Sequence, residues 1–335
     1  MEMTMGQSLN APFPKKFKPI FNYCPVIVST NYKGGVGKTL SSRVLGQGIA
    51  DPNFAWFAQD KPVLILDFDP QGNTSMRWGL LEPVPDDPYG SLKPVPHPEL
   101  MAEEPNYSSV CDPWLGIIEA AREGRAFDNA MFSPVPYRTS NPMIQVLPAD
   151  ERLMREAQQL SKNYVPFLGQ MLLNWLRSPE VATKYSAVII DTAPSKSNLI
   201  DAALTAATHV YIPFVPEPQS AEGVLSIIAY VSRFAQMRAA HDPLHLIGLL
   251  PNMVRRTQLH NNYLRALENE VVGKYMMTVR LNDRITYAET DSADGLPEAV
   301  TDLGNSNIAV EAKQFIRYVL ERVCETSASN FPRVA

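Results

Sequence analysis

The sequence predicts an α/β fold in which helices cover both faces of a doubly wound, mostly parallel sheet. Short runs of β-branched and other apolar residues alternate along the chain with longer segments whose apolar residues recur at helical spacing. Apolar runs without polar alternation are typical of strands buried on both faces, as parallel sheets require. A glycine-rich loop also joins the first run to the first helical segment, and sheets of this type bind ligands at such turns.

Five segments are predicted as strands, because each is a short apolar run bounded by turn-forming residues. They are residues 25–30, 62–70, 186–194, 209–216 and 245–252. Helical patterns lie between or after them, at residues 38–50, 221–240 and 257–272. Since the carboxyl ends of parallel strands share one edge of a sheet, polar residues that end these runs should lie close together.

A single domain is predicted for residues 25–325, preceded by a polar arm (1–24) and followed by a short tail (326–335). Residues 81–113 interrupt the alternating pattern with eight prolines and seven acidic residues against one lysine. Proline stops helix propagation, and so acidic a segment has little apolar surface to bury. We expect a surface loop inserted into the domain, without a core of its own.

Composition narrows the class of protein. Hydrophobic residues make up 45% of the chain and charged residues 19%, and the net charge of −5 gives no overall attraction to nucleic acid. Cys24, Cys111 and Cys324 lack metal-binding spacing, which favours a reducing compartment and disfavours an iron–sulfur or zinc site. No apolar run approaches the roughly 18 residues of a membrane span, and the N-terminus lacks a signal-peptide core. We expect a cytoplasmic protein.

The glycine-rich loop, "STNYKGGVGKTL" at residues 29–40, has the character of a phosphate-binding loop. It matches the pattern G-x-x-x-x-G-K-[ST] once the first glycine is relaxed. Gly34, Gly35 and Gly37 allow successive backbone N–H groups to converge on phosphate oxygens, and the following helix adds its positive end. A strand before the loop and a helix after it make a chance glycine-rich turn a poor explanation.

Two lysines belong to this loop. Lys38 is expected to reach the β- and γ-phosphates of a nucleotide, and the hydroxyl of Thr39 is expected to bind Mg²⁺. Lys33 stands at the opposite, outer end of the loop. Charge that develops at a γ-phosphate needs a cation, and a lysine displaced from Lys38 could serve a nucleotide other than its own.

Carboxylates end two of the predicted strands. Asp67 and Asp69, two residues apart in "LDFDPQGN", can face the same side of an extended segment. Asp191 follows an entirely apolar run in "VIIDTAP", a position typical of an acid that holds a metal-bound water. A single aspartate here would more often cap a helix, but three beside a phosphate loop indicate a site for Mg²⁺ and a hydrolytic water.

Together, "KGGVGKT", "LDFDPQGN" and "VIIDTAP" resemble the motifs of the ParA/MinD family, the P-loop ATPases with a deviant Walker A motif, and most closely its ParA-type partition ATPases. Further segments agree in type and spacing, namely "VLPADERLMREAQQL", "FVPEPQSAEGV", "NMVRRTQLH" and "DRITYAETDSADGLP". The resemblance covers roughly residues 24–325 apart from the proline-rich insertion. It implies the same fold, with ATP and Mg²⁺ bound at the loop.

The resemblance also implies roles for individual residues. Lys33 would cross a dimer interface and touch the partner's nucleotide phosphates, so that two ATP molecules join two subunits. Asp69 would position the attacking water, while Asp67 and Asp191 would support Mg²⁺ through its water ligands. Asn252 would recognise the adenine base, although an Asn after a strand is often only a turn residue.

Phosphate contacts are implied along the whole loop. The implied residues are Gly34, Gly35, Val36, Gly37, Lys38, Thr39 and Leu40. Leu40 departs from the family pattern, which commonly has a second threonine there, so a hydroxyl contact to the α-phosphate is expected to be lost. Backbone donors can compensate for that loss.

The partners implied by the resemblance are a second copy of the chain, DNA bound without sequence preference, and a ParB-like adaptor that stimulates hydrolysis. Such a protein would be associated with the nucleoid and would segregate plasmid or chromosomal DNA. DNA binding requires basic side chains arrayed against phosphates. Candidates are Arg255, Arg256, Arg265, Lys274, Arg280, Arg284, Lys313, Arg317 and Arg322. The same region, 251–322, holds nine basic and ten acidic residues, so only folding and pairing could produce a basic patch.

Four alternatives use the same type of fold. A MinD-like ATPase that cycles on membranes would need an amphipathic C-terminal helix, whereas this chain ends in the polar, proline-containing "TSASNFPRVA". A nitrogenase iron protein would need paired cluster cysteines, which the three cysteines do not provide. An ATPase that positions a non-DNA cargo remains open, because the sequence does not distinguish it. A nucleotide-bound scaffold without turnover is disfavoured by the intact set Lys38, Thr39, Asp69 and Asp191.

Overall fold

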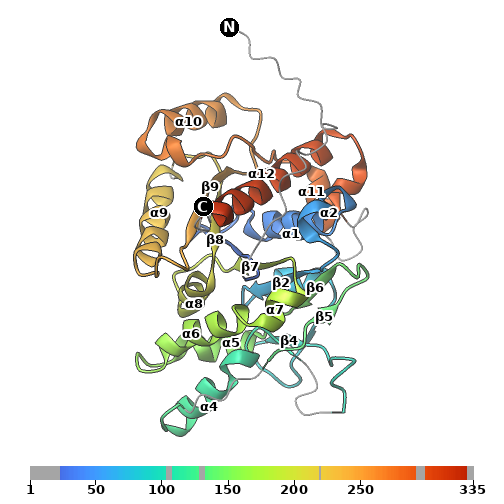
Figure 1. Cartoon of the computed structure of the whole chain (residues 1–335), viewed down its shortest axis with the longest axis vertical. Coiled ribbons are helices and arrows are strands. Elements are labelled where there is room, and N and C mark those ends of the chain that lie inside the picture. The colour runs from blue at the N-terminus through green and yellow to red at the C-terminus, as the bar shows by residue number, and fades with distance from the viewer. Residues whose placement is uncertain (1–22, 103–107, 128–132, 219, 292–298, 330–335) are drawn as a thin grey trace, which may run out of the picture.

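The computed structural model describes residues 23–102, 108–127, 133–218, 220–291 and 299–329. Its centre is a seven-stranded sheet in the order β5-β6-β2-β7-β1-β8-β9 (Figure 1). All neighbours pair in parallel except β5, which is antiparallel to β6. The strands are β1 (Val26–Ser29), β2 (Val63–Phe68), β5 (Tyr137–Arg138), β6 (Ile144–Leu147), β7 (Ala187–Thr192), β8 (His209–Phe214) and β9 (His245–Pro251). The predicted fold class and its five strands are confirmed, while the short β5 and β6 add to them.

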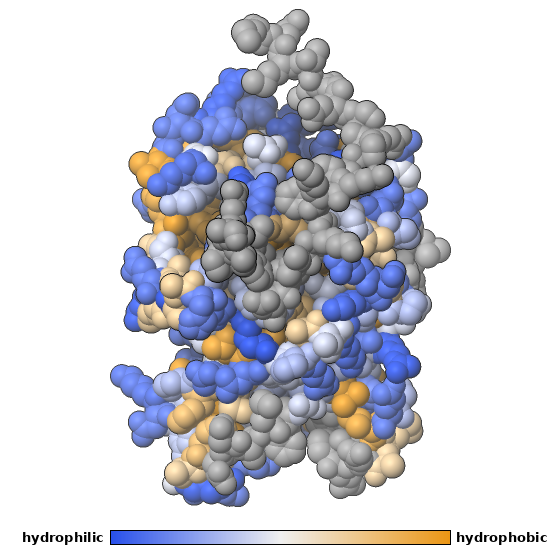
Figure 2. Space-filling model, in the orientation of Figure 1, coloured by the Kyte–Doolittle hydropathy of each residue, from blue (hydrophilic) through white to orange (hydrophobic). Residues whose placement is uncertain are grey.

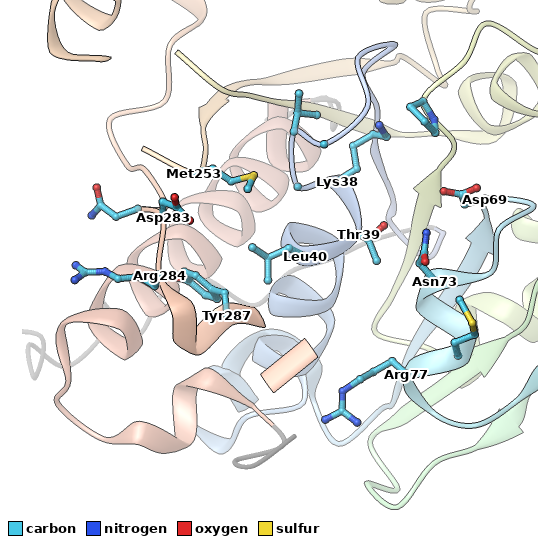
Figure 3. Close-up of a pocket in the computed structure, with 16 residues that line it drawn as sticks. Lys38, Thr39, Leu40, Asp69, Asn73, Arg77, Met253, Asp283, Arg284 and Tyr287 are labelled. Carbon is cyan, nitrogen blue, oxygen red and sulfur yellow. The ribbon is translucent and has the colours of Figure 1, made fainter. Parts of the chain in front are cut away.

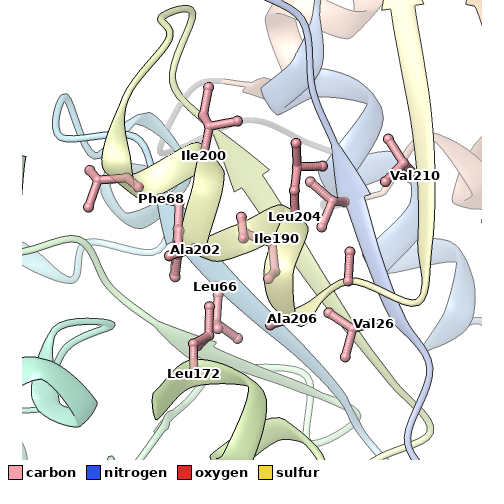
Figure 4. Close-up of a cluster of buried hydrophobic side chains, with 14 of the residues drawn as sticks. Val26, Leu66, Phe68, Leu172, Ile190, Ile200, Ala202, Leu204, Ala206 and Val210 are labelled. Atoms are coloured by element: carbon pink, nitrogen blue, oxygen red, sulfur yellow. The ribbon is translucent and has the colours of Figure 1, made fainter. Parts of the chain in front are cut away.

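Side chains alternate between the two faces of the sheet, as the two-residue period of a strand requires. Val26 and Val28 of β1 belong to one hydrophobic core, whereas Ile27 belongs to the other. The helices that pack on the first core are α4 (Leu115–Glu123), α5 (Glu151–Gln159), α6 (Val165–Leu176), α7 (Pro179–Lys184), α8 (Asn198–Ala206), α9 (Ser220–Gln236) and α10 (Gln258–Asn269). Figure 4 shows part of this core, where Leu66 and Ile190 of the sheet face α8. Each large apolar side chain buried in this way contributes about 1.5–3 kcal/mol.

The second core lies beneath α1 (Lys38–Ile49), α2 (Ala55–Ala58), α11 (Ile285–Asp291) and α12 (Asn307–Ser329). Two glycines inside α1 allow this helix to pack closely. A Cβ atom at Gly46 would lie 2.7 Å from Ile65 Cδ1, and one at Gly48 would lie 2.2 Å from Ile316 Cδ1. The helix that carries the phosphate loop is therefore held tightly between β2 and α12.

The proline-rich insertion is more ordered than a surface loop. β3 (Leu81–Pro83) and β4 (Leu92–Pro94) form an antiparallel hairpin, and Val110 and Cys111 are buried in the first core. The expectation that residues 81–113 pack no core was therefore wrong for Val110 and Cys111, which are buried close to Trp114. The remaining short elements are α3 (Asn73–Arg77), η1 (Pro52–Phe54), η2 (Asp112–Trp114), η3 (Val271–Tyr275) and η4 (Val300–Leu303).

At both predicted boundaries of the domain, a few further residues belong to its core or to its last helix. Most of the predicted arm (1–24) lies outside the described residues, but Cys24 is buried in the first core. Residues 326–329 of the predicted tail continue α12. Among the helices that the structure describes, none is long and apolar enough to cross a membrane. On the face drawn in Figure 2, hydrophobic residues form small patches separated by hydrophilic ones.

Candidate nucleotide-binding site

A cavity of about 600 Å³ opens at the carboxyl end of the sheet, beside the glycine loop (Figure 3). Its walls come from the loop and α1, from the turn after β2 with α3, and from the segment that leads into α11. The residues that line it are Gly35, Val36, Gly37, Lys38, Thr39, Leu40, Asp69, Asn73, Met76, Arg77, Pro194, Met253, Asn282, Asp283, Arg284 and Tyr287. Its position at the edge where the strands end is the one predicted for the ligand.

The loop adopts a conformation that depends on glycine. Gly35 and Gly37 have φ angles of 69° and 77°, in the left-handed region that other residues rarely adopt. A Cβ atom at Gly37 would also lie only 2.2 Å from Asn252 Nδ2. α1 begins directly after Gly37, so its first backbone N–H groups have no partners within the helix and are available to an anion.

Lys38 is nearly buried, and its Nζ donates a hydrogen bond to the carbonyl oxygen of Lys33 at 3.1 Å. Burial lowers the pKa of Lys38, while the carboxylates of Asp191 and Asp69 act in the opposite direction. The loop therefore curls around its own lysine. A phosphate group in the cavity would therefore meet the Lys38 ammonium group already desolvated and held in position.

Asp191 is fully buried and receives hydrogen bonds from three hydroxyl groups of neighbouring elements. Thr74 donates to Asp191 Oδ2 at 2.8 Å and Ser42 to Oδ1 at 3.3 Å, while Thr39 is a third donor. Burial raises the pKa of Asp191 to about 6, although the hydrogen bonds from Thr74 and Thr39 lower it. Thr39 is thus held between this carboxylate and the cavity, as a magnesium ligand from α1 needs to be.

Asp67 lies beside Asp191, because β2 and β7 pair in register at these two residues. Its Oδ2 accepts hydrogen bonds from the backbone N–H and the hydroxyl of Ser75, at 2.8 and 2.6 Å, and its Oδ1 accepts from Asp69 N at 3.2 Å. Burial, together with the charge of the adjacent Asp191, raises the pKa of Asp67 to about 8. Asp67 does not line the cavity, so its role toward Mg²⁺ remains a prediction. What it does in the structure is hold α3 and the turn that carries Asp69.

Asp69 lines the cavity opposite the loop (Figure 3). Its Oδ1 accepts a hydrogen bond from Gln71 N at 3.0 Å, and its carbonyl oxygen accepts one from Gly72 N at 2.8 Å. These two contacts fold the chain into a tight turn before α3. Among the described residues, the other carboxylate oxygen of Asp69 has no hydrogen-bond partner, so it is available to orient a water molecule in the cavity.

Lys33 and Gly34 belong to the outer part of the loop and do not line the cavity. Lys33 Nζ forms an ion pair of 2.7 Å with Glu217 Oε2 of the same chain. The predicted contact of Lys33 with a partner's nucleotide is therefore not part of the geometry of the single chain. That contact remains a prediction, and it requires Lys33 to leave Glu217.

Asn252 is fully buried directly behind the loop. Its Nδ2 donates to the carbonyl oxygens of Val36 at 2.8 Å and Gly37 at 3.2 Å, and its Oδ1 accepts from Met253 N at 2.9 Å. In the structure, Asn252 therefore stabilises the conformation of the loop. Met253 lines the cavity, whereas Asn252 does not. Adenine recognition by Asn252 remains a prediction that would require this amide to give up a backbone partner.

The structure describes the surroundings of several predicted DNA contacts. Arg284 lines the cavity and forms an ion pair of 2.7 Å with Glu311, and its contact with DNA remains a prediction. Other candidates are exposed but already paired, as Arg255 is with Asp283 and Arg322 with Glu325. Glu311 also accepts from Asn282 Nδ2 at 2.6 Å, so α12 holds the segment that forms this wall.

The sequence analysis missed most of the wall that faces α1. Asn73, the last residue of the motif "LDFDPQGN", and Arg77 belong to α3, and Tyr287 belongs to α11. Arg77 Nε donates to the carbonyl oxygen of Thr290 at 3.0 Å and so connects α3 with α11. The place of Asn73 within a recognised motif was a usable signal, whereas the approach of α11 depends on the tertiary fold.

No group of three or more His, Cys, Asp or Glu side chains within the described ranges could hold a metal ion by itself. Mg²⁺ does not need such a cage, because it commonly keeps several water ligands and binds through one or two protein groups plus substrate phosphates. The hydroxyl of Thr39 and the buried carboxylate of Asp191 fit that arrangement. The three cysteines are free and buried.

A glycine loop between a parallel strand and a helix, with a buried lysine facing strand-end aspartates, defines a P-loop nucleotide-binding protein. Residues 24–242 match a family model described as an AAA domain. The chain therefore belongs to this family, within which its motifs and relatives are those of the ParA-type partition ATPases.

Among known proteins, the chain is similar to the chromosome partitioning protein ParA of Caulobacter vibrioides, with 26% identity over 266 residues that cover 78% of this chain and 83% of the relative. Solved structures share the fold. Apo McdA of Cyanothece superposes with a TM-score of 0.61 at 17% identity, covering 88% of this chain and 99% of that one. Cobyrinic acid a,c-diamide synthase of Mycobacterium smegmatis with bound ADP and magnesium gives 0.58 at 22% identity, covering 93% and 99%.

Proposed function

We propose that the protein is an ATP hydrolase that pairs with a second copy of itself when ATP is bound, and that the pair binds DNA without sequence preference. The observation that carries this proposal is the convergence of Lys38, Thr39 and Asp69 on one cavity, while a second lysine stays at the outer end of the loop. Family membership supports it, because the relatives include a chromosome partitioning protein.

The cavity fits a nucleoside triphosphate with Mg²⁺. Its volume of about 600 Å³ lies in the range of small-molecule sites, and Lys38 faces the carboxylates of Asp69 and Asp191. Among proteins of the same fold, one is described as an McdA–ATP complex and another as a plasmid partition protein bound to AMPPNP. ATP is therefore the proposed substrate and Mg²⁺ the proposed cofactor.

Each residue has a distinct proposed part in hydrolysis. Lys38 and the N–H groups of the loop bind the phosphate oxygens, and Thr39 with Asp191 holds the metal and its water ligands. Asp69 orients the attacking water and accepts its proton. When bound, Mg²⁺ would neutralise the charge that develops on the phosphate oxygens. Slow turnover by the chain alone and stimulation by a ParB-like adaptor complete the proposal.

The test is to measure the mass of the protein in solution with ATP and with ADP, each with and without nonspecific duplex DNA. We expect a dimer with ATP, a monomer with ADP, and binding to DNA only in the ATP state. Lys38→Ala should abolish nucleotide binding, whereas Lys33→Ala should retain it and lose the dimer. A monomer at saturating ATP, or DNA binding that does not depend on the nucleotide, would contradict the proposal.

A further inference from the structure

The outer lysine of the loop is not a free surface lysine, because a carboxylate of the same chain holds it. Lys33 Nζ lies 2.7 Å from Glu217 Oε2, and the two side chains are 38% and 46% exposed. The hydrogen bond from Lys33 is the main reason that the pKa of Glu217 is lowered. In the single chain, Lys33, the cation proposed to contact the partner's nucleotide, is therefore already bound by a carboxylate of its own chain.

The backbone on both sides brings this pair together. Asn31 Nδ2 donates to the carbonyl oxygen of Pro213 at 2.9 Å, and Asn31 Oδ1 accepts from Lys33 N at 3.0 Å, so the loop is joined to the end of β8. Glu217 follows β8 between two prolines, in "VPEPQ", which restricts its backbone. The carboxylate is consequently presented by a stiff segment that is anchored to the same strand.

The other lysine of the loop adds a second restraint on Lys33. Lys38 Nζ donates to the carbonyl oxygen of Lys33, so the backbone of Lys33 is held by Lys38 while its side chain is held by Glu217. Both restraints use charges that a triphosphate also attracts. A nucleotide in the cavity competes for Lys38, and a triphosphate presented from outside competes for Lys33.

We propose that Glu217 is a positioning residue that holds Lys33 in an ion pair within its own chain, which we call the parked state. Pairing of two protomers then requires Lys33 to exchange this carboxylate for the triphosphate of the other protomer. The inference rests on the proposed ATP-dependent pairing. A triphosphate carries several negative charges, whereas Glu217 carries one, so the triphosphate binds the Lys33 ammonium group more strongly than Glu217 does. A diphosphate has fewer charges and competes less well for Lys33. The parked state thus raises the threshold for pairing and favours release after hydrolysis.

The size of the effect follows from the exposure of the ion pair. Exposed ion pairs contribute a factor of about 1.5 to 5 in an equilibrium constant. A symmetric dimer releases two parked lysines, and the factors multiply. Removing the Glu217 charge is therefore expected to lower the dissociation constant of the ATP-state dimer by about 2- to 25-fold.

The experiment measures that dissociation constant by equilibrium sedimentation, with a non-hydrolysable ATP analogue and Mg²⁺. The variants are Glu217→Gln, Lys33→Ala and the double variant, with Glu217→Asp as a shorter carboxylate that should have an intermediate effect. The matched control is Glu325→Gln, which removes the same charge from an ion pair with Arg322 of similar exposure, 51% and 53%. That pair lies near Thr326, which contacts His209 at the opposite end of β8 from the loop. Urea unfolding of each variant verifies that it is folded.

Glu217→Gln is expected to tighten the dimer and Glu325→Gln to leave it unchanged. The gain should vanish when Lys33 is also replaced, because the double variant should pair no more tightly than Lys33→Ala alone. Tighter pairing of the double variant than of Lys33→Ala would show that Glu217 acts through a contact other than Lys33 and would overturn the proposal. A dimer of Glu217→Gln that is as weak as or weaker than the wild type would overturn the parked state while leaving ATP-dependent pairing intact. Failure of the wild type to pair would instead contradict the proposed function itself.

Discussion

At the scale of single residues, three aspartates that the sequence places alike have different environments. Asp67 and Asp191 are fully buried in hydrogen-bond networks, and their pKa values are raised to about 8 and about 6. Asp69 alone lines the cavity and retains an oxygen directed at it. The sequence identified all three strand-end acids, and the resemblance implied different roles for them. The structure adds that only Asp69 of the three lines the cavity.

Asp69→Ala is expected to keep ATP binding and ATP-dependent pairing and to lower the turnover rate by at least about 100-fold, as the loss of a general base does. The rest of the phosphate site does not depend on this side chain, since Lys38 and Thr39 are held by other partners. Phosphate release and nucleotide affinity measured on the same preparation provide the test. Turnover at the wild-type rate would remove Asp69 from the mechanism.

Asn252→Ala distinguishes bracing of the loop from recognition of the base. Loss of the two hydrogen bonds to Val36 and Gly37 should weaken ATP binding by about 5- to 30-fold, at about 1 kcal/mol for each bond. If Asn252 braces the loop, GTP binding and inorganic triphosphate binding should fall by the same factor as ATP binding. A loss confined to ATP, measured by calorimetric titration, would support adenine recognition instead.

At the scale of elements, α1 shows how a functional helix is fixed by glycine inside it. Glycine normally weakens a helix interior, yet at Gly48 any side chain would collide with Ile316 of α12. Close packing of the C-terminal half of α1 on β2 and α12 fixes the position of this helix, and with it the position of the loop at its N-terminus. A sequence pattern alone would count Gly48 as a weakness of the predicted helix.

Gly48→Ala is therefore expected to destabilise the fold by about 1–2 kcal/mol, because overpacking costs about 1–3 kcal/mol and the gain in helix propensity offsets up to about 1. The control is Gly223→Ala in α9, where a Cβ atom would meet nothing within 4 Å. That variant should instead gain up to about 1 kcal/mol. Urea unfolding of both variants checks the opposite signs, and equal effects would contradict the packing argument.

The elements also show what sequence can and cannot predict. The five predicted strands are largely continuous apolar runs, and their predicted ranges agree with β1, β2, β7, β8 and β9. The hairpin of β3 and β4, the edge strand β5 and its neighbour β6 are each only two to four residues long, so their formation depends on neighbouring elements. For the same reason the loop half of the site was predicted, while the α11 wall and the Lys33–Glu217 pair were not.

At the scale of the whole molecule, the carboxyl ends and the amino ends of the strands form two different sets of contacts. The carboxyl edge holds the nucleotide cavity, whereas the amino edge joins the end of α12 to the sheet through a buried histidine. His209 Nε2 lies 2.8 Å from Thr326 Oγ1, and its ring stacks on His245 at 5.3 Å. Burial lowers the pKa of His209 to about 3, so the ring is neutral in the folded protein.

This arrangement predicts a loss of stability in mild acid that is separate from the nucleotide site. The pKa of His209 is lower in the folded chain than in the unfolded chain, where it is near 6.5. Its contribution to the free energy of unfolding is therefore fully present above about pH 6.5 and is lost as the pH falls toward 3. Between pH 7 and pH 5 the loss amounts to about 2 kcal/mol. The raised pKa values of Asp67 and Asp191 act in the opposite direction, because these groups bind more protons when folded, and therefore favour the fold as the pH falls from about 8 toward 4.

His209→Gln separates the two contributions, since it removes the titrating ring and leaves the aspartates unchanged. The variant should lose stability at pH 7, but its free energy of unfolding should fall by about 2 kcal/mol less than that of the wild type between pH 7 and pH 5. Urea unfolding at both pH values, without nucleotide, measures the difference. Parallel pH profiles of the two proteins would show that His209 is not the group responsible. A flatter profile for the variant would show that the attachment of α12, at the edge away from the cavity, limits stability in acid.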